Sequence, residues 1–395
     1  MRLALLTDDW HPTGGVASYV RLVAPALARA GHEVLVLHAG HDSASDSLPG
    51  VSVRGILGAF RDFGPAANAV AARAVTDALQ AFGADVAHVH ANNNLPLGDA
   101  VCALLPTVKT IHALDLCPSG SKFHFATGHT CTYVTGAMCL PRQVYLRCTL
   151  SKRPNVIWRQ QQRTRGANAQ LRQYREVITA SEYIRQLAID NGVPADRLSV
   201  IPYYTTAPVD VSAARGRSVL FVGRLTPEKG LDLLLKALSR VAGDWHLTVV
   251  GDGIGMAKER ARVAAMRLSD RVTFRGWLLD EALTDAYRDA AVVVVPSRWP
   301  EPFGIVGIEA MAFARPVVAF GVGGIPEWLN DGEGGFLVEP QSVARLAERI
   351  TQLLDDPVAA GRVAVLGRAR VMREFSEAQH LSRLLPVYER VRAVG

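Results

Sequence analysis

Residues Ala291–Met311 read AVVVVPSRWPEPFGIVGIEAM, and this stretch is the strongest indication of the fold class. Four consecutive valines are typical of a strand that is buried on both faces, as in a parallel sheet covered by helices. The Pro-rich loop at 296–303 ends the strand, and a helix follows it. The stretch therefore predicts a strand, a loop that carries Glu301, and a helix that carries Glu309 about one turn inside its start.

Short apolar runs like this one alternate with helical patterns from end to end, which predicts parallel sheets built from βαβ units. In the first half the expected strands are Arg2–Thr7, His32–His38, Asp85–His90, Pro106–His112, Glu176–Ala180 and Leu198–Pro202. In the second half they are Ser218–Gly223, His246–Gly251, Arg271–Gly276, Ala291–Pro296, Pro316–Phe320 and Gly335–Val338. The fold class is therefore α/β, with two Rossmann-like, doubly wound domains facing across a cleft, where such sheets bind ligands.

The domain boundary is expected near residue 208, because Tyr203–Asp210 and the small residues that follow have linker composition. Residues 1–207 form the first domain and 208–378 the second. Residues 379–395 are expected to form a last helix, either an extra helix of the second domain or one that crosses back to the first.

Composition excludes several classes of protein. The 395 residues are 49% hydrophobic and 20% charged, with 34 Gly and 21 Pro spread along the chain, which rules out disordered, collagenous and coiled-coil proteins. No apolar run approaches the ~20 residues of a membrane span, and no signal peptide is visible. Five Cys without an export signal indicate a reducing cytoplasm.

The net charge of +6 favours anionic partners, and its distribution is uneven. From Leu116 to Arg175 there is no Asp or Glu. The cations in this segment are Lys122, Arg142, Arg147, Lys152, Arg153, Arg159, Arg163, Arg165, Arg172 and Arg175. A solvated basic helix explains the segment as well as attraction to an anionic acceptor or to the inner face of a membrane. Nucleic acid is disfavoured, because no zinc-finger spacing or interleaved aromatic pattern accompanies the charge.

Two loops have the residues that phosphate binding requires. Gly14 and Gly15 follow the first strand and open a helix, so backbone N–H groups there can approach a phosphate, although a Gly-Gly turn is more often only a tight turn. In Gly223-Arg-Leu-Thr-Pro-Glu-Lys-Gly230, Arg224 leaves a strand end and Lys229 stands at the next helix start. These two cations can clamp a diphosphate, and a surface salt bridge would explain them about as well.

The third loop combines carboxylates with a helix N-terminus. The amides of Gly304, Ile305 and Val306 suit a phosphate, whereas Glu301 and Glu309 suit sugar or ribose hydroxyls, because each carboxylate oxygen accepts hydrogen bonds. A loop acid followed by a helix-stabilising Glu is the simpler alternative. A further strand, glycine turn and acid follow at Phe320–Glu327.

Together these motifs resemble the retaining nucleotide-sugar glycosyltransferases of glycosyltransferase family 4, which have the two-domain GT-B fold. The matching motifs are Pro12-Thr-Gly-Gly-Val16, Gly31-His-Glu-Val34, Gly223–Gly230, Gly251-Asp-Gly253, the Glu301 to Glu309 spacing, and Gly323-Gly-Ile-Pro-Glu327. Two positions depart from the family pattern. Ala314-Arg315 stands where the family usually has Gly and a variable residue, and the two tyrosines at 203–204 replace a usual Pro-Asn-Gly-Val turn.

The resemblance implies a role for each matching residue. Glu309 binds the ribose of the donor and Glu301 binds the transferred sugar, while Arg224 and Lys229 stabilise the departing diphosphate. Gly15 belongs to the loop that closes over the diphosphate, and His112 lies near the donor sugar and acceptor, although a core histidine at a strand end is the alternative for His112. The full expected donor site is Gly14, Gly15, Arg224, Lys229, Gly251, Gly276, Glu301, Phe303, Gly304, Ile305, Val306 and Glu309.

The reaction implied by the resemblance is retaining, metal-independent sugar transfer without a cofactor. UDP is the favoured nucleotide and GDP is open, and the acceptor is a glycan, a lipid-linked molecule or a natural product, selected by the first domain. The alternatives are a non-catalytic nucleotide-sugar-binding protein and a GT-B epimerase. The epimerase would need its own acid and base at the donor C2, which the motifs do not suggest.

The Cys-containing basic insert at 116–175 is the least explained part of the chain. Cys117, Cys131, Cys139 and Cys148 could hold a structural Zn²⁺, but no CxxC knuckle is present, so buried or unpaired thiols are the favoured interpretation. The sugar, the base, the acceptor and the oligomeric state are not determined by the sequence.

Overall fold

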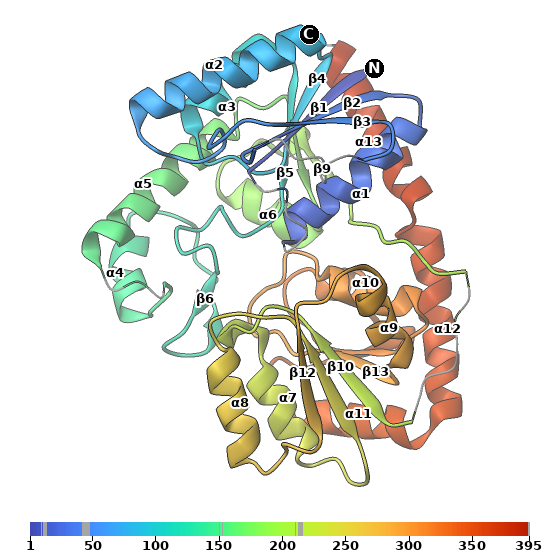
Figure 1. Ribbon diagram of the computed structural model, residues 1–395. Helices are drawn as coiled ribbons and strands as arrows, with labels where there is room; N and C mark the ends of the chain where they lie inside the picture. The colour runs from blue at the N-terminus through green and yellow to red at the C-terminus, as the bar shows by residue number, and fades with distance from the viewer. Residues whose placement is uncertain are drawn as a thin grey trace. The chain divides into compact units, whose positions relative to one another are not determined.

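The computed structural model describes residues 1–8, 10, 14–41, 48–149, 151, 153–209, 211 and 216–393. The chain divides into two compact units, each built around its own seven-stranded sheet (Figure 1). The first unit contains Met1–Lys122, Thr132–Pro202 and the C-terminal stretch from His380. The second contains Tyr203–Gln379 and the short segment Phe123–Cys131.

The sheet of the first unit has the strand order β3-β2-β1-β4-β5-β8-β9, and all its pairs are parallel. Its strands are β1 (Arg2–Thr7), β2 (Glu33–His38), β3 (Val51–Gly55), β4 (Val86–Val89), β5 (Thr107–Ile111), β8 (Glu176–Thr179) and β9 (Leu198–Val200). β1 and β4 are almost wholly buried, which explains their mostly apolar sequences. An order that starts at β1 and winds outward in both directions is that of a Rossmann-like domain.

Helices connect these strands. They are α1 (Gly15–Arg29), α2 (Pro65–Phe82), α3 (Leu95–Leu104), α4 (Cys139–Tyr145), α5 (Pro154–Gln170) and α6 (Glu182–Asp190). Their ends follow ordinary sequence signals: Asn94 and Ser181 cap α3 and α6 with their side chains, and α2 runs from Pro65 to a left-handed glycine at Gly83. The basic insert contains two of these helices, α4 and α5.

The sheet of the second unit repeats the plan, with the parallel order β12-β11-β10-β13-β14-β16-β15. Its strands are β10 (Ser218–Val222), β11 (His246–Val250), β12 (Val272–Gly276), β13 (Val292–Val295), β14 (Val317–Phe320), β15 (Asn330–Asp331) and β16 (Gly334–Val338). Its helices are α7 (Leu231–Leu238), α8 (Met256–Ala265), α9 (Asp280–Asp289), α10 (Ile305–Ala312), α11 (Val343–Asp355) and α12 (Pro357–Glu374). The four valines at 292–295 are buried, as their sequence predicts.

Two details differ from the expectations. The chain passes from the first unit to the second at Tyr203 rather than at 208, because Tyr203 and Tyr204 pack into the second unit: Tyr204 is fully buried and the Tyr203 ring lies 5.5 Å from that of Phe303. Asp210 and 212–215 of the expected linker lie outside the described residues. A short antiparallel hairpin, β6 (Phe123–His124) and β7 (His129–Thr130), groups with the second unit although it belongs to the basic insert.

The last helix, α13 (Glu377–Ala393), belongs to the first unit from His380 onward. Within that unit the Tyr388 hydroxyl lies 2.6 Å from Nδ1 of His88, and Arg390 pairs with Glu176 at 2.9 Å. Of the two alternatives that the sequence allowed for this helix, the structure therefore has the one in which it returns to the first sheet.

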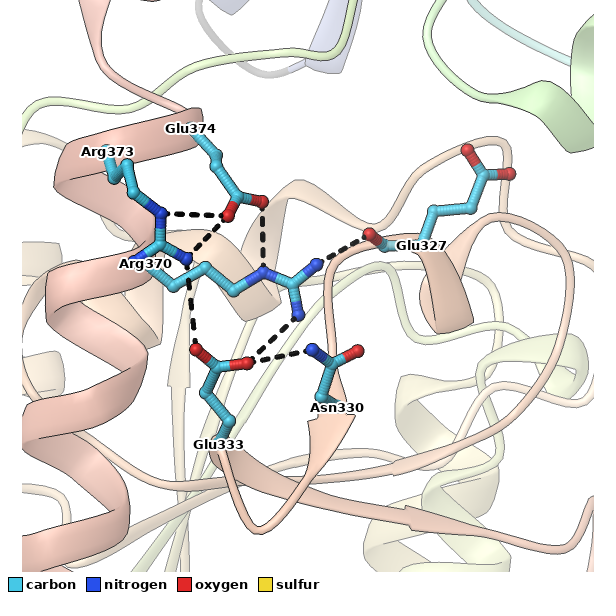
Figure 2. A network of polar contacts seen from close by, with 6 residues as sticks. All are labelled: Glu327, Asn330, Glu333, Arg370, Arg373 and Glu374. Atoms are coloured by element: carbon cyan, nitrogen blue, oxygen red, sulfur yellow. Dashed lines mark hydrogen bonds and ion pairs between the residues drawn. The ribbon is translucent and has the colours of Figure 1, made fainter.

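A buried arginine fixes α12 to the end of the second sheet, as Figure 2 shows. Arg370 donates to Glu374 at 3.1 Å and to the carbonyl of Glu327 at 3.1 Å, and its guanidinium lies 3.7 Å from Glu333. Asn330 donates to the same Glu333 carboxylate at 2.8 Å. The network holds the turn around Glu327, the last residue of the motif Gly323-Gly-Ile-Pro-Glu327.

Candidate donor-sugar site and its surroundings

The expected donor residues of the second unit lie at the carboxyl edge of its sheet. Because the strands are parallel, the loops that follow β10, β11, β12, β13 and β14 meet at one edge. Backbone hydrogen bonds join these loops: the amide of Gly251 donates to the carbonyl of Gly276 at 2.7 Å, and the amide of Leu225 donates to that of Asp252 at 2.8 Å. The structure therefore brings Gly251, Gly276 and the Arg224 loop together.

Lys229 and Glu301 form an ion pair in this edge. Lys229 Nζ lies 2.7 Å from Glu301 Oε1, and the Ser297 hydroxyl donates to the same oxygen. Glu301 is buried, which by itself would raise the pKa of its carboxyl, but the Lys229 charge and the hydrogen bonds more than offset burial and leave the pKa below its usual value. Glu301 is thus ionised at neutral pH and held in one orientation.

Two further features arrange the cations. The Lys229 ammonium lies 4.9 Å from the centre of the Trp299 ring, which adds a cation–π contact to the ion pair. The Arg224 side chain is exposed and has no polar partner within the described part of the chain. Arg224 can therefore turn toward an incoming anion at little cost, whereas Lys229 is already positioned.

An ion pair that the sequence motifs do not single out supports this loop. Arg298 donates to Asp232 at 2.6 Å, both side chains are largely buried, and the Arg298 amide donates to the carbonyl of Glu228 at 2.8 Å. These contacts tie the loop after β13 to the turn that carries Lys229. Asp232 stands in the first turn of α7, where acidic side chains commonly interact favourably with the helix dipole. Its sequence context therefore gave no reason to expect an ion pair with Arg298.

Glu309 accepts a hydrogen bond of 2.6 Å from the hydroxyl of Tyr287, whose ring is buried and stacked on Phe313. Glu309 keeps some exposed surface, but its carboxyl lies deep enough that burial raises its pKa to about 6, in spite of the bond from Tyr287. Tyr287 comes from α9 and carries no motif, so sequence reasoning missed it. It orients the carboxylate that is expected to bind a ribose.

The N-terminus of α10 carries the amides of Gly304, Ile305 and Val306, all partly exposed. Gly304 has φ 90°, a left-handed conformation that favours glycine, and no side chain of the described residues caps the helix. Uncapped amides at a helix N-terminus are suited to an anion. Phe303 differs from its expected role: its side chain is buried and packs on Tyr203 and Phe375, so it belongs to the core rather than to a ligand-binding surface.

The glycine turn after β14 supports Glu301 from behind. The Gly324 amide donates to the carbonyl of Glu301 at 2.8 Å. Gly323 has φ 58°, and a Cβ there would lie 2.2 Å from the same carbonyl. The turn at Gly323 and Gly324 therefore holds the backbone of Glu301 in place.

The end of α10 explains the departure at Ala314. The amide of Ala314 donates to Met311 and that of Arg315 to Ala310, both at 2.9 Å, which is the hydrogen-bond pattern of a Schellman motif. Ala314 has φ 50°. The position therefore has the left-handed backbone for which the family uses Gly, and the chain accommodates an alanine there.

Gly14, Gly15 and His112 lie in the first unit. Gly14 precedes α1 in extended backbone, and Gly15 begins the helix; a Cβ on Gly15 would meet nothing within 4 Å. Asp9, His11, Pro12 and Thr13 of the same motif lie outside the described residues. His112 follows β5, and its Nε2 lies 3.0 Å from Nδ1 of the buried His90. Burial holds the pKa of both imidazoles well below the usual value, so this pair is neutral.

A cavity of about 430 Å³, lined by polar and apolar side chains, lies entirely within the first unit. The polar part of its wall includes two cations, two acids and several amides; these residues are Lys109, Arg163, Asp8, Asp115, Asn92, Gln160 and Asn168. Lys109 donates to the carbonyl of His90 at 2.8 Å, and burial lowers its pKa to about 8, although Asp115 and Asp8 favour its charge. Side chains of this kind bind hydroxyl groups from several directions.

None of the five cysteines forms a disulfide. Within the described ranges, no group of three or more His, Cys, Asp or Glu side chains is placed so that it could hold a metal ion. The structure therefore does not bring Cys117, Cys131, Cys139 and Cys148 together as the metal-binding group that the sequence left open. A search of the same described residues finds no helix with the length and apolar character of a membrane span.

Solved structures place this architecture in the GT-B class. The chain superposes on sucrose-phosphate synthase from Thermosynechococcus elongatus with a TM-score of 0.76, 25% identity and 100% of each chain covered. It superposes on HepE from Anabaena, solved in complex with UDP and glucose, with a TM-score of 0.73 and 23% identity, covering 98% of this chain and 99% of the other.

Sequence comparison gives the family. The model described as Glycosyltransferase Family 4 matches residues 13–203, and that described as Glycosyl transferases group 1 matches residues 216–356. The chain therefore belongs to glycosyltransferase family 4. It is 38% identical over 177 residues to D-inositol 3-phosphate glycosyltransferase of Mycolicibacterium smegmatis, a match that covers 44% of this chain and 40% of the relative. The matched region thus spans less than half of that relative.

Proposed function

We propose that this chain is a retaining glycosyltransferase that moves a sugar from a nucleoside diphosphate sugar to a hydroxylated acceptor. The observation that carries the proposal is the Lys229–Glu301 pair beside the uncapped N-terminus of α10, with Glu309 on the same helix. A diphosphate needs cations and amide donors, and a sugar and a ribose need acceptors. The second unit offers all of these at one sheet edge.

In the proposed reaction the bond between the anomeric carbon and the diphosphate breaks, and the acceptor oxygen forms its bond on the same face. The proton of the acceptor hydroxyl passes to the departing diphosphate. Arg224, Lys229 and the α10 amides stabilise the negative charge that develops on the leaving group, which is the electrostatic role that usually dominates such catalysis. Glu301 holds hydroxyls of the transferred sugar and Glu309 those of the ribose.

This scheme assigns the stabilisation of the leaving group to two side-chain cations, so we propose a metal-independent reaction. UDP is the proposed nucleotide, with GDP open; the HepE structure, whose partner molecules are UDP and glucose, supports UDP. Because none of the five cysteines forms a disulfide, we propose the cytoplasm as the compartment.

The acceptor is proposed to bind in the cavity of the first unit. Lys109 and Arg163 balance Asp8 and Asp115 in its wall, and amide and hydroxyl side chains supply further polar groups. A volume of about 430 Å³ fits a polyhydroxylated group of mono- or disaccharide size better than a long chain. Free, glycan-borne and lipid-linked acceptors all have such a group. His112 stays a proposed contact of the reacting sugar, since its neutral imidazole can exchange hydrogen bonds with hydroxyls.

The test is transfer itself. Purified protein is incubated with UDP-glucose, UDP-galactose, UDP-N-acetylglucosamine and GDP-mannose and a panel of small polyols, and products are read by mass spectrometry. The anomeric coupling constant in the NMR spectrum of a product reports the stereochemistry. A product with the donor's anomeric configuration supports the proposal, and an inverted product contradicts it.

A further inference from the structure

The basic insert exposes an unusual number of large apolar side chains. Tyr145 is 80% exposed and Trp158 is 54% exposed. The full set in this region is Tyr133, Val134, Met138, Val144, Tyr145 and Trp158. These residues lie in the segment before α4, in α4 itself and in the first turns of α5, and α4 packs beside α5 (Figure 1). We call the described residues of the range 133–159, which leaves out 150 and 152, the insert surface.

Hydrogen bonds and a stacking contact hold the backbone of the insert surface in place. The Thr135 hydroxyl donates to the carbonyl of Leu116 at 2.6 Å, and Gln161 of α5 donates to that of Gly136 at 3.0 Å. The Arg142 guanidinium stacks 3.5 Å from the centre of the Tyr133 ring. The exposed apolar side chains are therefore presented on a backbone that is fixed from both ends.

Positive charge accompanies these side chains along the acid-free segment. The exposed arginines of the acid-free segment are Arg147, Arg153, Arg159, Arg163, Arg165, Arg172 and Arg175. Lys122 differs from this set, because it is buried and donates to the carbonyl of Tyr133, and Lys152 lies outside the described residues. The Asp62 carboxylate lies near enough to Arg163 and Arg159 that their charges, after hydrogen bonds from Asn68 and Gly64, help to lower its pKa. The balance stays strongly positive.

We propose that the insert surface binds an anionic lipid membrane peripherally. Aromatic side chains with a polar atom, such as Tyr145 and Trp158, suit the boundary between headgroups and acyl chains. Arginines near an anionic leaflet each add attraction. The aliphatic side chains of Val134, Met138 and Val144 find an apolar environment there, which a phosphate backbone of nucleic acid does not offer.

A second copy of the chain is a poorer partner for this surface. A two-fold contact would place the same patch against itself. The arginines of one copy would then face those of the other without intervening acids, which is unfavourable. Charge complementarity therefore favours lipid.

Helix α5 extends from the insert surface to the cavity of the first unit. Trp158 and Arg159 lie near the exposed start of this helix, whereas Gln160, Thr164 and Asn168 line the polar cavity. One helix thus connects the insert surface with the proposed acceptor cavity. Lipid binding does not rest on the proposed function, but if both hold, an acceptor anchored in the membrane would be presented next to the cavity.

The experiment is vesicle flotation with the full chain. Neutral phosphatidylcholine vesicles are compared with vesicles that also contain phosphatidylglycerol, at low and high salt. We expect binding to the anionic vesicles that weakens as salt rises. Each Arg→Glu change at Arg147 and Arg159 should weaken it about fivefold or more. Tyr145→Ser with Trp158→Ser should weaken it about tenfold or more.

Matched controls separate the insert surface from general charge and hydrophobicity. Val70→Ser with Val358→Ser removes two equally exposed apolar side chains elsewhere, and Arg73→Glu with Arg240→Glu reverses two exposed arginines elsewhere. These variants should keep binding within about twofold. Equal loss in both sets overturns the proposal, as does equal binding to neutral and anionic vesicles.

Two further outcomes would also overturn it. One is tight binding of single-stranded RNA that the Tyr145 and Trp158 changes abolish without any binding to vesicles. The other is a dimer, detected by light scattering, that the same changes dissociate. A thermal shift by UDP is measured on every variant. A protein that shifts with UDP but ignores vesicles contradicts only the membrane proposal, and one that floats but binds no nucleotide contradicts only the proposed function.

Discussion

Lys229 Nζ lies 2.7 Å from Glu301 Oε1, and this contact joins the residue expected to hold a diphosphate to the residue expected to hold a sugar. The Ser297 hydroxyl donates to the same carboxylate oxygen, so both contacts fix one orientation of Glu301. The pair is also largely buried, with side-chain exposures of 17% for Lys229 and 8% for Glu301. Its charges are therefore positioned before any donor binds.

Loss of Lys229 should destabilise the fold more than loss of the Glu301 charge. Lys229→Ala leaves the Glu301 carboxylate buried without its cation, which should lower the free energy of unfolding by about 3 kcal/mol. Glu301→Gln removes the buried charge and retains an oxygen for Ser297, so its cost should be about half of that. Urea denaturation at pH 7 measures both values. Equal and negligible losses would show that the pair is not buried as described.

Both changes should nevertheless impair transfer. Lys229→Ala removes charge stabilisation of the leaving group and should lower kcat by about a hundredfold or more. Glu301→Gln should lower kcat/KM by about tenfold or more, because a neutral amide accepts hydrogen bonds from sugar hydroxyls less strongly. Turnover close to that of the unchanged protein in either variant would refute the assignment of the site.

Glu309 should couple nucleotide binding to pH. Its pKa is raised to about 6 in the folded protein from 4.5, so the folded state holds this proton more tightly than the unfolded chain. The contribution of Glu309 to stability is therefore largest below pH 4.5 and declines as the pH rises through about 6. Nucleotide affinity should move in the opposite direction, because the ionised carboxylate accepts the ribose hydrogen bonds.

Glu309→Gln tests this coupling. The variant should gain about 1–2 kcal/mol of stability at pH 8, since it removes a buried charge. Its UDP affinity should be about tenfold weaker at pH 8, with a smaller difference from the unchanged protein at pH 5.5. Calorimetric titrations at the two pH values, with thermal melts as the stability readout, check both statements. A pH-independent difference would mean that Glu309 does not contact the ribose.

The glycine turn behind Glu301 offers a test with an internal control. A Cβ at Gly323 would lie 2.2 Å from the Glu301 carbonyl, whereas a Cβ at Gly332 would meet nothing within 4 Å, and both residues have positive φ. Gly332→Ala therefore costs only backbone strain of about 1 kcal/mol. Gly323→Ala should cost at least 2 kcal/mol more and also weaken donor binding. Equal costs, measured by urea denaturation, would contradict the described packing.

Ala314 offers the opposite change. Its φ of 50° is strained for an alanine but not for a glycine. Ala314→Gly should therefore raise the free energy of unfolding by about 0.5–1 kcal/mol and leave activity unchanged, because the residue lies at the C-terminal end of α10, away from the N-terminus that is proposed to bind the anion. A thermal melt that shows destabilisation would refute the strained backbone.

Metal removal should leave transfer intact. In the proposed scheme Arg224 and Lys229 act on the leaving group, so dialysis against EDTA should change kcat by less than about twofold. Strong inhibition that Mg²⁺ or Mn²⁺ restores would contradict the scheme. Slow loss that only Zn²⁺ restores would instead indicate a metal at the cysteines, contrary to their arrangement in the described residues.

The fold could be predicted because the strands of a parallel sheet have a characteristic sequence pattern of consecutive apolar residues. Runs such as Val292–Val295 are buried on both faces and have no reason to alternate with polar residues. β3 and β15 were missed for the opposite reason, since Val51–Gly55 is half exposed and Asn330–Asp331 is a polar pair at the sheet edge. The point at which the chain passes from the first unit to the second was missed, because the burial of Tyr204 depends on tertiary packing.

The site was predictable where a motif concentrates its residues and not where distant elements supply support. Glu301, Glu309 and Lys229 stand in short motifs. Tyr287 comes from α9, and its contact with Glu309 depends on how two helices pack, which no local pattern encodes. Phe303 shows the converse, because a residue inside the motif faces the core.

The most direct test of the central claim is a calorimetric titration of UDP, GDP and ADP into the unchanged protein and into Lys229→Ala at matched temperature and pH. The account predicts that UDP binds the unchanged protein and that Lys229→Ala weakens this binding by about tenfold or more, because the diphosphate loses a cation. No binding of any nucleotide, or equal UDP affinity in the two proteins, would contradict a nucleotide-sugar site at the edge of the second sheet.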